Sequence, residues 1–150
     1  MEKDNLLEVK FYDSIEDVLL KFAVIIAQSD GKWVFCKHKD RVTYEVPGGH
    51  REDGENILET AKRELYEETG AIDFTIKPVC VYSVEGNIRV NENVNEETYA
   101  MLYVADITFF ENEIHSEIER ILITEELVDN WTYPLIHPLL IEEATRRGFI

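Results

Sequence analysis

The segment GHREDGENILETAKRELYEETGA, at residues 49–71, constrains the fold more than any other part of this sequence. Its apolar residues recur with the period of a helix over residues 55–69, and Gly70 stands where a helix commonly ends. The loop before it, Pro-Gly-Gly at residues 47–49, can continue neither a helix nor a regular sheet ladder. The segment therefore predicts a loop followed by one amphipathic helix, which must pack against other elements.

The predicted helix carries three carboxylates beside its apolar stripe. At about 100° per residue, Glu64, Glu67 and Glu68 fall within an arc of about 100°. The stripe that they flank consists of Ile57, Leu58, Ala61 and Leu65. Like charges at this spacing destabilise an isolated helix, whereas a divalent cation such as Mg²⁺ or Mn²⁺ binds oxygen-rich clusters of this kind. Spacing alone leaves two interpretations open, a metal site or an acidic face in contact with solvent.

The rest of the chain reads mainly as strands. We expect strands at residues 18–28, 33–37, 44–46, 74–84, 99–109 and 120–123. We also expect a brief helix that Thr124 caps and that extends to residue 128, and a last helix that runs from Pro138 to residue 147. The Asp-Gly pair at residues 30–31 predicts a hairpin between the first two strands. With one helix in mid-chain and one at the end, these elements predict an α/β sandwich around a mixed sheet, in one domain that spans residues 1–150.

The charge of the chain limits its partners. With 31 acidic against 15 basic residues, the formal net charge is −16, so the surface repels nucleic-acid polymers. A small anionic ligand can still bind to so acidic a protein if metal ions neutralise its charge. No apolar run approaches the roughly 20 residues that span a bilayer, and residues 1–10 resemble no signal peptide, which predicts a cytoplasmic protein without a membrane partner. Cys36 and Cys80 are expected to be buried, reduced thiols rather than zinc ligands. No sequence signal indicates an oligomeric state.

The segment at residues 49–71 resembles the Nudix box, G-x5-E-x7-R-E-U-x-E-E-x-G-U, in which U is aliphatic. The matching residues are Gly49, Glu55, Arg63, Glu64, Leu65, Glu67, Glu68 and Gly70. Ala71 occupies the last aliphatic position and is smaller than the residue usual there. So many specified positions at fixed spacing are far more specific than a short glycine motif. The resemblance implies the Nudix αβα sandwich and hydrolysis of a nucleoside diphosphate linked to a further group, with Mg²⁺, or alternatively Mn²⁺, as cofactor.

The resemblance also implies roles for individual residues. Glu64, Glu67 and Glu68 take the metal-ligand positions, and Arg63 with Glu55 is expected to orient Glu64. A further ligand or the water-activating base commonly comes from a glutamate outside the box. Our choice for it is Glu117, and the alternatives are Glu119 and Glu97.

The substrate is indicated by the stretch before the box. The pattern His38-x-x-Arg41-x-x-Tyr44-Glu45-Val46-Pro47-Gly48-Gly49 is similar to that of MutT-like triphosphatases of the YtkD type. This implies a nucleoside triphosphate as substrate, including oxidised purine forms such as 8-oxo-dGTP. Arg41 is then expected to contact phosphate and Tyr44 the base, while Gly48 and Gly49 let the backbone approach the ligand. Two alternatives stay open: another nucleoside diphosphate derivative as substrate, or a module that senses a nucleotide without cleaving it.

Overall fold

The computed structural model describes residues 7–86, 97–111 and 118–150, without the side chains of residues 119 and 120. In chain order its elements are β1 (Glu8–Tyr12), a 3₁₀ turn (Asp17–Leu19), β2 (Leu20–Ser29), β3 (Lys32–His38), β4 (Gly48–His50), α1 (Ile57–Thr69), β5 (Ala71–Glu85), β6 (Thr98–Phe110), β7 (Ile118–Thr124) and α2 (His137–Arg146). Neither described helix has the length and apolar character needed to cross a bilayer.

The strands form a mixed sheet with the order β1-β5-β6-β2-β3-β7. At its centre β2 and β6 run parallel, and every other pair of described strands is antiparallel. Strand β4 lies off this path, because it pairs with the first half of β2 while β3 pairs with the last residues of β2. Along this edge of β2, the hydrogen-bonded partner strand therefore changes from β4 to β3. The loop that joins these two strands returns at this point, where the carbonyl of Pro47 accepts a hydrogen bond from the N–H of Ile25 (2.9 Å).

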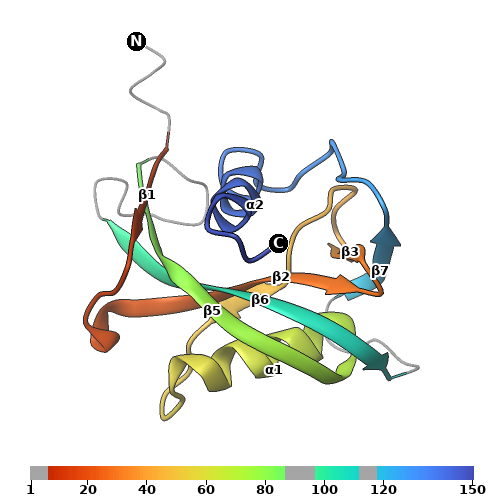
Figure 1. The fold of residues 1–150 in the computed structure, drawn as a ribbon, viewed down its shortest axis with the longest axis horizontal. Coiled ribbons are helices and arrows are strands. Elements are labelled where there is room, and N and C mark those ends of the chain that lie inside the picture. The colour runs from red at the N-terminus through yellow and green to blue at the C-terminus, as the bar shows by residue number, and fades with distance from the viewer. Residues whose placement is uncertain (1–6, 87–96, 112–117) are drawn as a thin grey trace.

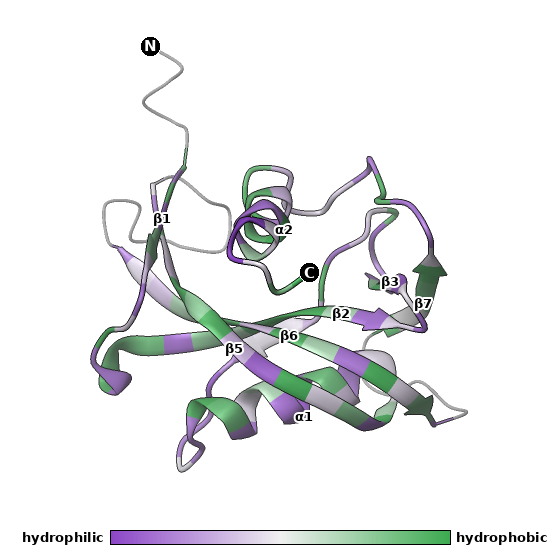
Figure 2. Ribbon diagram, in the orientation of Figure 1, coloured by the Kyte–Doolittle hydropathy of each residue, from purple (hydrophilic) through white to green (hydrophobic). Residues whose placement is uncertain are grey.

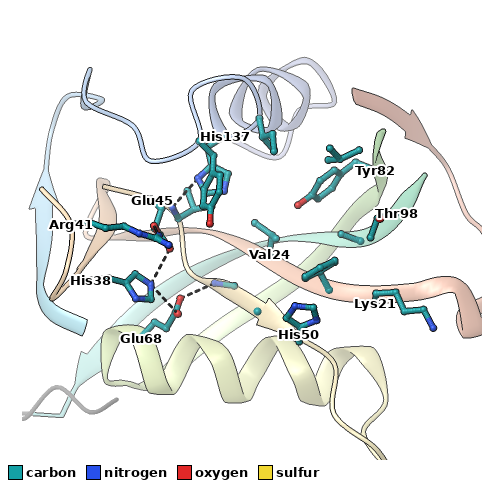
Figure 3. Close-up of a pocket in the computed structure, with 18 residues that line it drawn as sticks. Lys21, Val24, His38, Arg41, Glu45, His50, Glu68, Tyr82, Thr98 and His137 are labelled. Atoms are coloured by element: carbon teal, nitrogen blue, oxygen red, sulfur yellow. Dashed lines mark hydrogen bonds and ion pairs between the residues drawn. The ribbon is translucent and has the colours of Figure 1, made fainter. Parts of the chain in front are cut away.

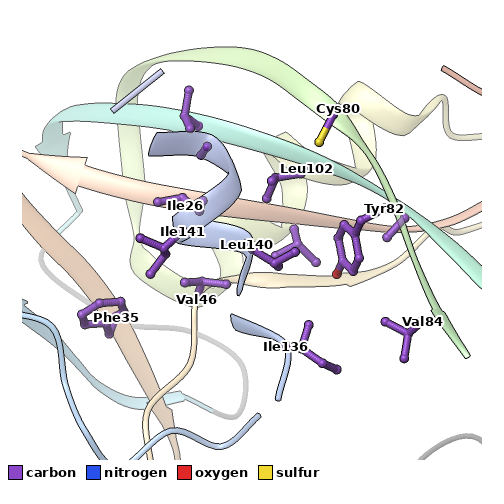
Figure 4. Close-up of a cluster of buried hydrophobic side chains, with 14 of the residues drawn as sticks. Ile26, Phe35, Val46, Cys80, Tyr82, Val84, Leu102, Ile136, Leu140 and Ile141 are labelled. Atoms are coloured by element: carbon purple, nitrogen blue, oxygen red, sulfur yellow. The ribbon is translucent and has the colours of Figure 1, made fainter. Parts of the chain in front are cut away.

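The two helices cover opposite faces of the sheet (Figure 1). Because side chains alternate along a strand, neighbouring residues of β2 belong to different cores. Ile25 packs in the cluster that contains Leu65 of α1. Ile26 packs in the cluster on the other face, with Leu140 of α2 (Figure 4). The same alternation gives β5 and β6 their green and purple bands in Figure 2. The expected αβα sandwich around a mixed sheet is confirmed.

Several local signals predicted their elements correctly. The hairpin turn uses positive φ at Asp30 (53°) and Gly31 (77°), as the Asp-Gly pair requires. Helix α1 begins two residues later than predicted, because the Asn56 side chain accepts from the N–H of Glu59 while the Glu59 side chain accepts from the N–H of Asn56. The helix ends at Gly70 in the left-handed conformation, with φ 79°. Both cysteines are buried and free, as expected.

Two expectations about secondary structure were wrong. Tyr44 and Glu45 form isolated bridges rather than a strand, whereas Gly48–His50, which we expected to interrupt the ladder, forms β4. The glycines make this possible, because a side chain on Gly48 would collide with the backbone of β2. Residues 125 and 126 form a bend, and residues 127 and 128 have no regular structure, so the expected helix is absent there. The Thr124 hydroxyl accepts from the N–H of Glu126 (3.2 Å) and so closes a local turn rather than capping a helix.

The apolar stripe of α1 also differs in one position. Leu58 is 38% exposed, whereas Ala61 and Leu65 are fully buried. The buried side of the helix includes Thr60 and Glu68 instead. The stripe is therefore centred closer to the glutamates than the apolar residues alone indicated, and part of the acidic cluster lies inside the protein.

Candidate active site

Strand β4 brings the backbone of two glycines against the carboxylates of α1. The N–H of Gly48 donates to Oε1 of Glu68 (3.0 Å). A Cβ on Gly49 would overlap the carboxylate of Glu64, and a Cβ on Gly48 would lie 2.7 Å from the carbonyl oxygen of Ala23. The absence of side chains at both positions therefore lets β4 fit between β2 and α1.

Arg63 binds Glu55 in the loop before α1 and two of the carboxylates of the helix. Its Nε and Nη2 donate to the two oxygens of Glu55 (2.5 and 3.1 Å), which is a bidentate pair. Its Nη1 donates to Glu64 (3.0 Å) and Glu67 (3.3 Å), and Nη2 also donates to the carbonyl of His50 (2.9 Å). The hydrogen bonds from Arg63, together with one from the N–H of Glu52, lower the pKa of Glu55 to about 2. The contacts are those required of a residue that fixes the loop and orients Glu64.

Two of the three helix carboxylates lie where charge is disfavoured. Glu68 is 8% exposed, and burial raises its pKa to about 8, although the N–H of Gly48 acts in the opposite direction. Burial raises the pKa of Glu64 to about 7, although Arg63 opposes the shift. The side chain of Glu67 is 39% exposed. Repulsion between the neighbouring carboxylates also raises both pKa values, but burial is the larger cause.

A second buried acid lies beside Glu68. Glu45 is buried, and its Oε2 lies 3.0 Å from Nε2 of His38, which is also 3.6 Å from Oε2 of Glu68. Its other oxygen accepts a hydrogen bond from Nη1 of Arg41 (2.9 Å). The Arg41 guanidinium lies 5.9 Å from the centre of the Tyr133 ring, within range of a cation–π contact. His38 thus lies between Glu45 and Glu68, and Arg41 is held on Glu45 (Figure 3).

A pocket of about 570 Å³ opens beside this cluster, between the sheet and the start of α2 (Figure 3). Its polar end is lined by His38, Arg41, Glu45, Gly48, Gly49 and Glu68. The remainder of the lining is mainly apolar or aromatic, with Phe22, Val24, Val46, Tyr82, Val84, Ala100, Tyr133, Ile136 and His137, together with Lys21, His50 and Thr98. Of the three α1 carboxylates, Glu68 alone lines the pocket. Such a shape can take a ligand with one anionic end and one flat apolar end.

The structure brings most of the residues expected at the site together. Glu64, Glu67 and Glu68 lie with Arg63 on one side of α1, and Arg41, Gly48 and Gly49 line the pocket. Tyr44, which we expected at the base, is instead buried in the core cluster that contains Phe35 and Trp131. It is not part of the lining that the described residues form.

Three glutamates outside the box, Glu117, Glu119 and Glu97, were the candidates for a further metal ligand or the water-activating base. Glu117 lies outside the described residues, as does the side chain of Glu119. The Glu97 carboxylate accepts hydrogen bonds from Tyr12 and Ser83 (2.5 Å each) and from Tyr99 (2.9 Å). These hydroxyls belong to β1, β5 and β6, and Glu97 is not among the described residues that line the pocket.

Sequence reasoning gave no role to several residues of the site. His38 and Glu45 belong to the stretch before the box, and an acid inside the apolar run of residues 44–46 was the available signal. Tyr82 and His137 reach the pocket from β5 and α2, and no sequence pattern linked them to it.

The donor atoms of the cluster fit a divalent cation. Within the described ranges, no three His, Cys, Asp or Glu side chains form a ready-made set of metal ligands. The helix carboxylates are nevertheless hard oxygen donors of the type that Mg²⁺ and Mn²⁺ prefer. Arg63 contacts one oxygen of Glu64 and one of Glu67. Because burial disfavours the charge on Glu64 and Glu68, a cation beside them would stabilise their ionised forms.

Comparisons with known proteins agree with this arrangement. A family model described as NUDIX domain matches residues 19–135. The chain is 32% identical over 127 residues to the Bacillus subtilis (strain 168) protein named "Putative 8-oxo-dGTP diphosphatase YtkD". That alignment covers 84% of this chain and 75% of the relative.

Solved structures share the fold. A crystal structure of a mutant form of the Bacillus subtilis pyrophosphohydrolase BsRppH has a TM-score of 0.77 at 27% identity, covering 96% of this chain and 92% of its own. A NUDIX hydrolase from Nitrosomonas europaea has a TM-score of 0.66 at 18% identity, covering 85% and 89%. The second similarity concerns the fold alone.

Proposed function

This chain belongs to the Nudix hydrolase family, and from that premise we propose that it splits a nucleoside triphosphate into the monophosphate and pyrophosphate with the help of Mg²⁺. Family membership makes it an enzyme that hydrolyses phosphoric anhydrides of small nucleotides with a divalent cation. Oxidised purine triphosphates such as 8-oxo-dGTP are the substrates that we propose first, because the relative from Bacillus subtilis carries that activity in its name.

The proposal rests on one observation, which is that a single pocket has a polar end and an apolar end. Glu68 and Arg41 line its polar end, where the Gly48–Gly49 backbone also approaches, while the rest of the lining is mainly apolar. A triphosphate matches the polar end once cations offset its charge, and a nucleobase matches the apolar end in size and polarity. A purely structural acidic face would need no such pocket.

The reaction adds water across an anhydride bond. The water oxygen bonds to phosphorus, the bond from that phosphorus to the bridging oxygen of pyrophosphate breaks, and a carboxylate accepts the proton. Glu68 is our candidate for the proton acceptor because it alone of the α1 carboxylates lines the pocket. Glu117 remains the alternative from outside the described residues.

The other residues bind and orient. Glu64, Glu67 and Glu68 would hold the cation, and Arg63 keeps Glu64 and Glu67 in place through its hydrogen bonds. Arg41, anchored on Glu45, can donate to a phosphate oxygen at the polar end. A Mg²⁺ ion held by these carboxylates would supply positive charge for the phosphate oxygens and would lower the pKa of the attacking water.

A panel of nucleotides with Mg²⁺ tests the proposal. We expect 8-oxo-dGTP and ordinary triphosphates to yield monophosphate and pyrophosphate, identified by chromatography. ADP-ribose and dinucleoside polyphosphates represent the alternative of another nucleoside diphosphate derivative, and preferential cleavage of these would replace the triphosphate. Binding of nucleotides without any cleavage would favour the sensing module instead.

A further inference from the structure

Tyr82 is a buried polar residue in the wall of the pocket. It comes from β5, is 5% exposed and packs beside Val84 and Leu102 (Figure 4). Its hydroxyl points toward the middle of the pocket (Figure 3). In the part of the chain that the structure describes, this hydroxyl makes no hydrogen bond. A buried hydroxyl without a partner costs stability, so its retention calls for a partner that the protein itself does not supply.

His137 supplies a second buried group of this kind. It stands at the start of α2, is 6% exposed and lines the same pocket. Its Nδ1 accepts a hydrogen bond from the N–H of Val46 (3.3 Å). Burial lowers the pKa of His137 to about 3, so the ring is neutral and its one proton lies on Nε2. This Nε2–H has no acceptor within residues 7–86, 97–111 and 118–150.

The two donors reach the pocket from different layers of the fold. Tyr82 projects from the sheet and His137 from the helix that covers it (Figure 3). The surfaces near them are apolar, contributed by Val24, Ala100 and Ile136. A ligand that fits here is therefore flat and largely apolar, and carries hydrogen-bond acceptors on its edge. The imidazole Nε2–H can only donate, so it faces an acceptor and not an amino group.

We propose that Tyr82 and His137 bind the base of the substrate through these two groups and that the Nε2–H of His137 selects a keto purine over an amino purine. Guanine presents two acceptors, O6 and N7, on one edge, whereas adenine presents N7 beside an amino group that donates. The Nε2–H of His137 then donates to O6, and the Tyr82 hydroxyl, which can donate or accept, faces position 7, where guanine has an acceptor and 8-oxoguanine an N–H. With adenine bound in the same way, the Nε2–H would face the amino group, so that a donor would face a donor. This inference rests on the proposed function, because it assigns the apolar end of the pocket to the base of the nucleotide.

The variant Tyr82→Phe tests the proposal, since it removes the hydroxyl and keeps the ring. With Mg²⁺, wild-type protein should show a kcat/KM at least about 10-fold higher for GTP than for ATP. Replacement of His137 by asparagine, whose amide can donate or accept, should narrow the preference for GTP. In Tyr82→Phe, KM should rise about 3- to 10-fold for GTP and ATP alike, with kcat nearly unchanged. The melting temperature should stay equal or rise, because no protein hydrogen bond is lost.

The matched control is Tyr103→Phe. Tyr103 is also a buried tyrosine of the sheet, but it packs in the cluster on the α1 face and does not line the pocket. This variant should keep both KM values and the base preference. If Tyr82→Phe behaves like this control, or if wild-type protein prefers ATP, the proposal is wrong.

Binding of GMP and AMP, measured by calorimetry without turnover, separates this proposal from the proposed function. Tighter binding of GMP that weakens in Tyr82→Phe, with no cleavage of any nucleotide, would retain the base site and reject the hydrolase. Cleavage with equal GMP and AMP binding in both proteins would reject the base site alone. Neither binding nor cleavage would reject both.

Discussion

Replacement of Glu68 by glutamine should make the metal-free protein more stable and the enzyme nearly inactive. The side-chain amide in the variant Glu68→Gln keeps an oxygen that can accept the N–H of Gly48, but the change removes a carboxylate whose ionisation burial opposes. The pKa of Glu68 is raised from 4.5 to about 8 in the folded protein. Between these values the folded protein binds a proton that the unfolded chain has released, so stability falls as pH rises.

The size of the effect follows from the same linkage. With values of 4.5 and about 8, this carboxyl costs the folded protein about 3 kcal/mol at pH 7 but under about 1 kcal/mol at pH 5. Coupling to Glu64 spreads the proton over two groups and reduces the change assigned to one of them. The stability of Glu68→Gln relative to wild type should therefore increase by about 2 kcal/mol between pH 5 and pH 7.

Urea unfolding at pH 5, 6 and 7 in the presence of EDTA measures this difference. Glu142→Gln is the matched control, because Glu142 is an exposed residue of α2 whose replacement should change the free energy of unfolding by less than about 0.5 kcal/mol. Mg²⁺ should stabilise wild-type protein more than Glu68→Gln, so the difference between their free energies of unfolding should become smaller. A difference that stays flat with pH, or that shrinks as pH rises, would refute the argument that Glu68 is held against its charge.

Three further predictions concern the same region. His137→Asn should lose less stability than wild type in acid, since His137, with its pKa lowered to about 3, stays neutral while the unfolded chain takes up a proton below pH 6.5. Urea unfolding should give a relative change of about 2 kcal/mol from pH 7.5 to 5, and a constant difference would contradict it. Gly48→Ala should destabilise the protein by about 1–3 kcal/mol in thermal unfolding, because its Cβ would meet the Ala23 carbonyl at 2.7 Å; an unchanged melting temperature would disprove the fit of β4. NaCl added at saturating Mg²⁺ should leave KM flat or slightly lower, because the chain carries a formal charge of −16. A steep rise in KM would indicate binding through a basic groove, and nucleic-acid polymers would again have to be considered as substrates.

Local sequence determined what could be predicted about the fold. The Asp30-Gly31 turn and the end of α1 at Gly70 depend on residues adjacent in the chain, and both were correct. The pairing of Gly48–His50 with β2 depends on a strand more than twenty residues earlier, which no local pattern reports. Thr124 was read as a helix cap because the same hydroxyl serves both caps and turns.

The residues of the site likewise divide into those that local sequence could group and those that only the packing brings together. The carboxylates of α1 and Arg63 lie within one helix, so their spacing was enough to group them. Tyr82 and His137 reach the pocket only because β5 and α2 pack around β2, and the sequence contains no signal of that contact. The burial of Glu68 was not predicted for a related reason, because it depends on how α1 is rotated about its axis relative to the sheet.

The rate of pyrophosphate release as a function of Mg²⁺ concentration, in wild-type protein and Glu67→Gln, tests most directly that α1 carries the cation-dependent centre. Glu67 is partly exposed, and glutamine keeps the helix, so the variant should fold normally. We predict that release depends on Mg²⁺, stops in EDTA, and falls about 100-fold or more in Glu67→Gln even at saturating Mg²⁺. Wild-type rates in the variant, or release that persists in EDTA, would contradict the account.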